Sequence, residues 1–153
     1  MWRRGDSMNI VGHIKVDMAP VSTVMKRLGV TAQGDVQRFH TANVVRRIQR
    51  YMPYRSGAMI KLMIVHSPAD EPFIHVDAPY AHFQYEGKVW IYPPTGSTWA
   101  PKYGMKKKTD RDLTYDKSKN PEAGAHWDRA LMAAEGDAMR QELQDYVDRR
   151  AGG

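Results

Sequence analysis

The stretch NPEAGAHW at residues 120–127 opens an uninterrupted helical pattern that continues to Arg150. Asn120 is a residue type preferred at a helix N-cap, and Pro121 suits the first helical position because the N–H that proline lacks would be unpaired there. The spacing predicts a long C-terminal helix that begins at Asn120 and is anchored against a sheet by Trp127. The rest of its apolar stripe is predicted to be Leu131, Ala134, Ala138, Met139, Leu143, Tyr146 and Val147.

The segment before this helix, residues 88–119, differs in composition from its surroundings. Its first half interleaves Gly and Pro with aromatic residues. Its second half is basic: residues 102–119 hold seven Lys or Arg and three Asp, a local charge of +4. A short strand is predicted at 89–92 and an extended loop over the remainder. Such long loops are uncommon in compact domains and are usually functional or disordered.

Hydrophobic periodicity predicts the elements that precede this loop. The predicted helices cover residues 20–28 and 31–52, and the predicted strands cover residues 9–17, 58–66 and 73–77. Residues 79–85 are predicted to form a short helix or a turn that ends at Gly87. The strand at 58–66 is expected to form a hairpin with the strand at 73–77. In the helix at 31–52, the stripe Val36, His40, Val44, Ile48 and Tyr51 is predicted to face the core, and Arg46, Arg47 and Arg50 to be solvated.

These elements predict one α+β domain over residues 1–153. It consists of a small antiparallel sheet packed against two or three helices, a long C-terminal helix and an extended loop insertion. Residues 1–8 are interpreted as an N-terminal arm. At 153 residues the chain is long enough to bury a single core.

Charge, cysteine content and hydrophobicity limit the kinds of partner and site that the chain can have. The formal charge is +6, which indicates an acidic partner such as nucleic acid or an electronegative protein surface. The chain has no cysteine, which excludes disulfides and thiolate metal sites and fits a cytosolic protein. No apolar run approaches the ~20 residues that span a bilayer, so no membrane association is expected.

Catalytic and metal-binding patterns are not recognisable in the sequence. The six histidines lack the spacings of known zinc motifs. His75 and Asp77 would share one face of a strand, and a surface His–Asp pair is favoured there over a metal or acid–base site. Ser56 lacks the glycine pattern of a nucleophile elbow. We therefore expect no enzymatic activity, no metal and no cofactor.

The aromatic and basic residues of the 88–119 loop are the best candidates for binding. Three interpretations remain open: a loop that docks on a neighbouring protein, which is favoured, a single-strand nucleic-acid site, and a solvated loop. The candidate contacts to another subunit or partner are Trp2, Trp90, Tyr92, Trp99 and Tyr103. The candidate contacts to DNA phosphates are Lys102, Lys106, Lys107 and Lys108.

Three segments, taken in order, resemble signatures of small phage structural proteins. YMPYRSGAM at 51–59 is similar to a P-x-(D/R)-(T/S)-G-x-(L/M) turn, APYAHFQYEG at 78–87 to P-Y-A-x-x-Q-E/Y-x-G, and residues 120–127 to N-P-x-A-x-x-x-W. The match extends over about residues 45–150. Its motif residues are Gly57, Pro79, Tyr80, Gly87, Asn120, Pro121 and Trp127. The chain thus resembles the minor capsid, neck or tail-completion proteins of long-tailed bacteriophages.

This resemblance implies a structural function in the virion neck. Such proteins are implied to be small α+β subunits that form rings, hexamers or dodecamers, around the DNA channel between head and tail. The implied partners are further copies of the chain, the portal, adaptor or tail-tube proteins of the same virion, and packaged DNA bound without sequence specificity. Assembly would take place in the host cytoplasm. The alternative function is a basic nucleic-acid-binding module that uses the 99–108 loop.

Overall fold

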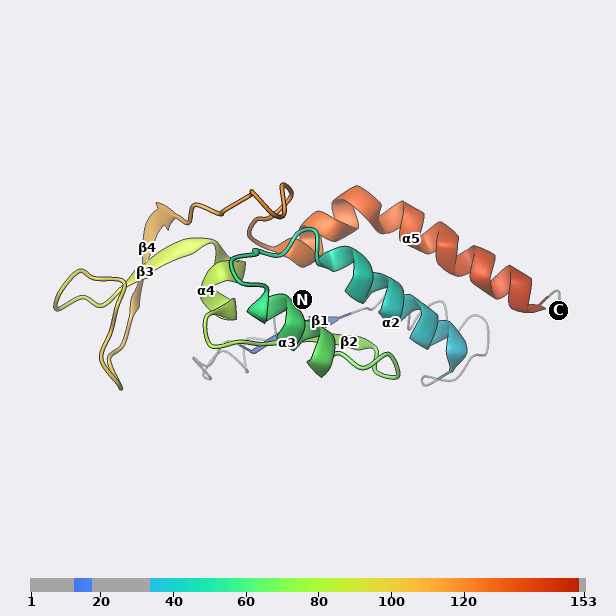
Figure 1. Ribbon diagram of the computed structural model, residues 1–153, viewed down its shortest axis with the longest axis horizontal. Coiled ribbons are helices and arrows are strands. Elements are labelled where there is room, and N and C mark those ends of the chain that lie inside the picture. The colour runs from blue at the N-terminus through green and yellow to red at the C-terminus, as the bar shows by residue number, and fades with distance from the viewer. Residues whose placement is uncertain (1–12, 18–33, 152–153) are drawn as a thin grey trace.

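The computed structural model describes residues 13–17 and 34–151. Over this part the fold is α+β, with four helices and two small antiparallel sheets (Figure 1). The elements in chain order are β1 (His13–Asp17), α2 (Asp35–Ile48), α3 (Ala58–His66), β2 (Phe73–Asp77), α4 (Ala81–Glu86), β3 (Lys88–Ile91), β4 (Lys107–Asp112) and α5 (Trp127–Ala151). The predicted N-terminal arm, with Trp2, and the predicted helix at 20–28 lie outside the described residues.

The core forms where α2, α3, β2, α4 and α5 meet. On α2 the predicted stripe is confirmed, because Val36, His40, Val44, Ile48 and Tyr51 are all buried. Ala78 and Ala81 reach the same core from the segment that begins α4. Of the two forms predicted for residues 79–85, a short helix or a turn, the helix is present as α4, and it ends at Gly87 as expected.

The strand predicted at 58–66 is wrong, because these residues form helix α3. The run AMIKLMIVH is apolar almost throughout, so its periodicity does not distinguish a strand from a helix. Ala, Leu and Met are strong helix formers, and they decide the outcome here. Met59, Ile60 and Met63 are the buried side of the helix, which packs on β2.

The expected hairpin between 58–66 and 73–77 is therefore absent, and β2 has a different partner. It pairs antiparallel with β1, with His13 opposite Asp77 and Asp17 opposite Phe73. Ser67 connects α3 to this sheet, because its Oγ accepts a hydrogen bond of 2.9 Å from the backbone N–H of His75.

Helix α5 lies along α2, as Figure 1 shows. It begins at Trp127, seven residues later than predicted, and its large buried side chains are Trp127, Leu131, Met139 and Leu143. Ala134 and Ala138, predicted to be part of the stripe, are exposed. Trp127 is fully buried, as expected of an anchor, although its nearest aromatic partner is on α4 rather than on a sheet.

Strands β3 and β4 form a two-stranded sheet that projects past α4, away from the helices (Figure 1). The strand predicted at 89–92 is present as β3. The extended loop predicted for the remainder is partly wrong, because residues 107–112 return as β4 and pair Ile91 with Lys107. We call residues 88–112 the arm.

Candidate interaction surfaces

The arm begins at a junction where the three segments of the phage resemblance meet. Asn120 Nδ2 donates hydrogen bonds to the backbone carbonyls of Gln49, at 2.8 Å, and Met52, at 2.9 Å. The backbone N–H of Gly124 donates to the carbonyl of Tyr51 at 3.2 Å. Asn120 therefore satisfies carbonyls at the C-terminal end of α2, and its predicted N-cap position on α5 is wrong. Pro121 accordingly lies in the turn and is exposed.

Tyr85 links α4 to the start of α5. Its carbonyl accepts a 3.0 Å hydrogen bond from the backbone N–H of His126, and its hydroxyl donates to Asp128 Oδ1 at 2.7 Å. The Tyr85 ring also packs edge-to-face on Trp127, with centroids 5.0 Å apart. The second and third resemblance segments are thus joined by both polar and aromatic contacts.

Gly87 is the root of the arm, between α4 and β3. Its φ of +71° is in the left-handed region, and a Cβ placed there would lie 2.6 Å from the Cβ of Ala125. The Gly87 carbonyl accepts from the backbone N–H of Leu113 at 2.9 Å, and Tyr115 Oη donates to the Gln84 carbonyl at 2.5 Å. Both ends of the arm are therefore attached to the same rigid junction.

The first resemblance segment lines a groove beside this junction. Gly57, with φ of +77°, precedes α3, and the Tyr54 ring approaches within 3.0 Å of the space that a Cβ would take there. The groove has a volume of about 580 Å³ and continues to Tyr80, Gln84 and residues 114–116. Pro79 and Tyr80 are exposed. Of the motif residues, Gly57 and Tyr80 thus border this groove, whereas Gly87, Asn120 and Trp127 form the junction.

The distal part of the arm exposes three large apolar side chains. Trp99 is 69% exposed, Met105 74% and Tyr103 90%. Tyr103 occupies the third position of a turn closed by a 2.8 Å hydrogen bond from the Gly104 N–H to the Pro101 carbonyl. Its φ is +67°, a conformation that costs a non-glycine residue about 1–2 kcal/mol. We call Trp99, Tyr103 and Met105 the arm tip.

The other predicted aromatic contacts have internal roles in the arm. Trp90 is half-buried and packs edge-to-face on His82, at 5.6 Å between centroids, and on Phe83, at 5.4 Å. Its indole nitrogen is buried with no hydrogen-bond partner. The backbone N–H of Tyr92 donates to the Ser97 carbonyl at 2.7 Å and closes a bridge. Of the predicted contacts in the described chain, Trp99 and Tyr103 are the exposed ones.

The arm lysines differ in how they are held. Lys106 Nζ lies 5.1 Å from the centroid of the Phe83 ring, and Lys108 Nζ lies 3.2 Å from Glu86 Oε2. Lys102 lies over the Tyr103 ring at 5.2 Å. Lys107 is exposed. Two of the four predicted phosphate contacts therefore hold the arm against α4.

A polar seam joins α2 to α5. Arg47, predicted to be solvated, has a side chain only 12% exposed and forms ion pairs with Glu135 and Glu142 of α5. Burial opposes ionisation of Glu135, but hydrogen bonds from Tyr51 and Arg47 together lower its pKa. The sequence offered no signal for this seam, since the glutamates come from a helix far along the chain.

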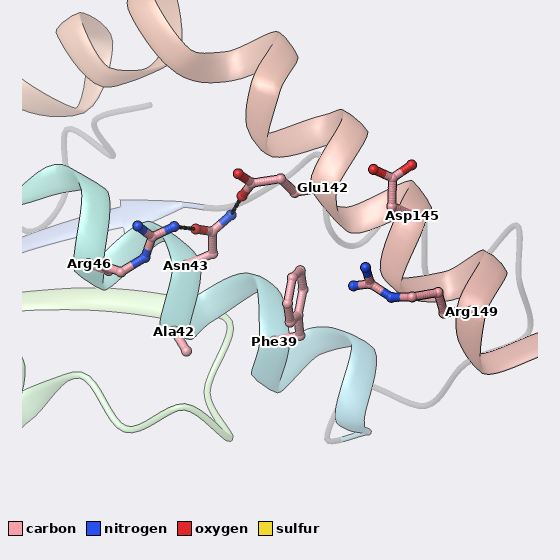
Figure 2. A pocket seen from close by; sticks show the side chains of 7 residues that line it. All are labelled: Phe39, Ala42, Asn43, Arg46, Glu142, Asp145 and Arg149. Atoms are coloured by element: carbon pink, nitrogen blue, oxygen red, sulfur yellow. Dashed lines mark hydrogen bonds between the residues drawn. The ribbon is translucent and has the colours of Figure 1, made fainter.

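An open hollow of about 450 Å³ lies beside this seam (Figure 2). Asn43 bridges its two walls: Oδ1 accepts from Arg46 at 2.7 Å and Nδ2 donates to Glu142 Oε2 at 2.6 Å. The side-chain amide and the two charged groups are thus satisfied by one another. The hollow is a feature of helix packing.

The predicted His75–Asp77 pair does not form. His75 Nε2 lies 3.2 Å from Glu71 Oε2, and Asp77 Oδ2 lies 3.0 Å from His66 Nδ1. Within residues 13–17 and 34–151, no three His, Asp or Glu side chains are grouped so as to hold a metal ion. Among the helices in this same part of the chain, none combines the length and the apolar character needed to cross a membrane.

Comparison of the chain with protein-family models, with curated proteins and with solved structures finds no match.

Proposed function

We propose that the protein is a non-enzymatic structural subunit of a phage virion neck. It forms a ring that joins the head to the tail, or completes that connection, around the DNA channel. The observation that carries the proposal is the arm: a projecting sheet with exposed Trp99 and Tyr103 at its end and a rigid root at Gly87. Aromatic side chains are favoured anchors in protein interfaces.

The junction supports the same function. A ring subunit needs a stiff body, so that the angle between its two contact surfaces is fixed and the ring closes. Asn120, Tyr85 and Trp127 supply that stiffness, because they tie α2, α4 and α5 together within the segments that resemble neck proteins. The resemblance and the packing thus concern the same residues.

A second candidate is a basic nucleic-acid-binding module. Exposed Trp99 and Tyr103 lie on the same arm as Lys102 and Lys107, a combination that suits stacked bases and phosphates. Lys106 and Lys108, however, face Phe83 and Glu86. Lys106 is thus half-buried, and Lys108, although 48% exposed, already has an acidic partner. Two of the four lysines are therefore engaged within the molecule, which favours the protein-contact function.

The first proposal is tested in a phage whose genome encodes the chain. Deletion of the gene is expected to yield separate heads and tails in electron micrographs, and wild-type protein supplied in trans restores joined particles. A shortened chain, in which Asn-Gly replaces residues 92–106, tests the arm directly. Because Ile91 and Lys107 lie opposite each other, a two-residue turn can connect them. The shortened protein should fold but should not restore joining; normal virions without the gene would refute the proposal.

The second candidate is tested by titrating the purified protein with single- and double-stranded DNA at low and high salt. A DNA-binding module requires tight binding that weakens with salt, and a further loss when Lys106, Lys107 and Lys108 are replaced by Glu. The absence of measurable binding at low salt would exclude it.

A further inference from the structure

Helix α3 has an uncovered apolar face. Met59, Ile60 and Met63 point into the core, whereas Ile64 is 45% and Val65 72% exposed. Lys61 and His66 are the polar residues of α3, and apolar side chains on a helix are normally turned towards the core. We call Ile64 and Val65 the α3 face.

The arm tip provides a matching surface. Trp99, Tyr103 and Met105 are each exposed within seven residues of the arm, and Tyr103 has an unfavourable backbone conformation. A glycine at this position would relieve the conformation but would remove the ring. Strain of this kind is typical of positions where the side chain has a function.

The two surfaces are also complementary in charge. Residues 99–108 contain four lysines and no carboxylate. Residues 58–77 contain one lysine, Lys61, which lies one turn before Val65, and three carboxylates. Asp77 is paired with His66, whereas Asp70 and Glu71 are exposed just after the C-terminal end of α3, with Glu71 beside His75. The helix dipole adds negative potential at that end. A basic apolar tip thus fits an apolar face with an acidic border.

We propose that the arm tip of one copy docks on the α3 face of a second copy. Figure 1 shows the arm projecting past α4 and away from α3, so the tip does not reach the face of its own molecule. Each copy then uses two different surfaces, and contacts of this heterologous kind produce rings when the rotation closes. The inference rests on the proposed function, because it assumes that a ring forms. It adds which two surfaces make the contact between neighbouring copies.

The size of this contact sets its strength. A buried Tyr or Trp covers roughly 150–250 Å², so the tip buries less than the ~800 Å² per partner of a standard stable interface. One contact alone is therefore weak, and the self-association is expected to depend on protein concentration. Ring closure gives every copy two such contacts. Added salt should weaken the association, because the charges are exposed.

The experiment is sedimentation velocity of the full-length protein over a range of concentrations up to about 1 mM, where even weak association is populated. Tyr103→Gly removes the aromatic side chain from the arm tip and should leave the midpoint of thermal unfolding unchanged or higher. Val65→Lys places a cation on the exposed face without touching the core. Each is expected to weaken self-association at least tenfold. Ala138→Lys, the same kind of change at an exposed site on α5, is the control and should have no effect.

Mixing the two variants provides the decisive measurement. The Tyr103→Gly copy retains an intact face and the Val65→Lys copy an intact tip, so the mixture should form one-to-one dimers that grow no further. A wild-type protein that is monomeric at every concentration, or a mixture that yields no dimer, overturns the inference. Discrete wild-type rings that both variants still form refute this contact and leave the ring function intact. Normal virions in the gene deletion refute the neck function and leave the contact standing.

Discussion

Gly87 is where the fold tolerates a side chain least. Its positive φ costs an alanine about 1–2 kcal/mol, and the clash with the Cβ of Ala125 adds a similar penalty for overpacking. Gly87→Ala is therefore expected to lower the free energy of unfolding by about 3 kcal/mol, measured by urea denaturation. Gly96 is the matched control, because its φ of +69° is similar but nothing lies within 4 Å of its Cβ position. Gly96→Ala should cost only about 1 kcal/mol. Equal losses of unfolding free energy in the two variants would show that Ala125 moves aside without an energetic penalty.

His40 couples the stability of the fold to pH. Burial lowers the pKa of this α2 side chain to about 4, so the native protein holds it neutral while the unfolded chain binds a proton near pH 6.5. Its contribution to stability is thus complete above pH 6.5 and is lost as the pH falls towards 4. The difference corresponds to about 3 kcal/mol, at 1.36 kcal/mol per pKa unit.

The measurement is urea denaturation at several pH values between 7 and 4. His40→Leu should remove most of the decline, because leucine binds no proton. His66→Leu, at an exposed position on α3 where the side chain contacts Asp77, serves as the comparison and should keep the decline that His40 causes. If the pH dependence of stability is unchanged in His40→Leu, the loss of stability at low pH comes from other groups.

At the scale of elements, Asn120 distinguishes two interpretations of one motif. An N-cap of α5 would accept Asp as readily as Asn. Instead, Asn120 donates to two carbonyls at the end of α2, where a carboxylate would lose both donors and face a negative dipole. Asn120→Asp is therefore expected to cost about 2 kcal/mol of stability, more than Asn120→Ala. Thermal denaturation of the two variants distinguishes the two interpretations. An Asn120→Asp protein as stable as wild type would support the N-cap assignment.

The sequence predicts the elements of this fold that have a long periodic pattern and fails on α3 and β4, which have none. The stripes on α2 and the existence of α5 follow from periodicity over many residues, and both are present. The α3 run carries no polar residue apart from Lys61 and His66, so its pattern does not fix its type, and the helix formers Ala, Leu and Met decide it. Strand β4 is a run of charged residues and Thr that only its pairing with β3 makes extended.

The candidate sites also include features that the sequence predicts and features that it does not. The exposure of Trp99 and Tyr103 is what their Gly- and Pro-rich surroundings predict. The α3 face could not be predicted, because the sequence predicts a strand at residues 58–66, and a strand places different side chains on its exposed side. The positive φ of Tyr103 depends on a turn whose only local signal is Gly104 one position later. Contacts between distant segments, such as Gly87 with Ala125, leave no trace in either segment alone.

At the scale of the whole molecule, stability is unevenly distributed. The body has a buried core from α2 to α5, whereas the arm beyond Gly87 contributes no residue to that core. The arm is held at its root by the Tyr115 and Leu113 hydrogen bonds and by Lys108 with Glu86. Two-stranded sheets without a core of their own are only marginally stable. The arm can therefore open while the body remains folded.

Hydrogen exchange followed by mass spectrometry measures this difference. Peptides from β3 and β4 are expected to exchange through local opening, orders of magnitude faster than peptides from α5, whose amides require global unfolding. The backbone N–H groups of Gly124 and His126, bonded to Tyr51 and Tyr85, should exchange as slowly as α5. Self-association should then slow exchange in the arm and in α3 together, because one contact covers both. Arm peptides that exchange as slowly as α5 in the dilute monomer would mean that the arm is part of the rigid body, and that ring assembly requires no ordering of its tip.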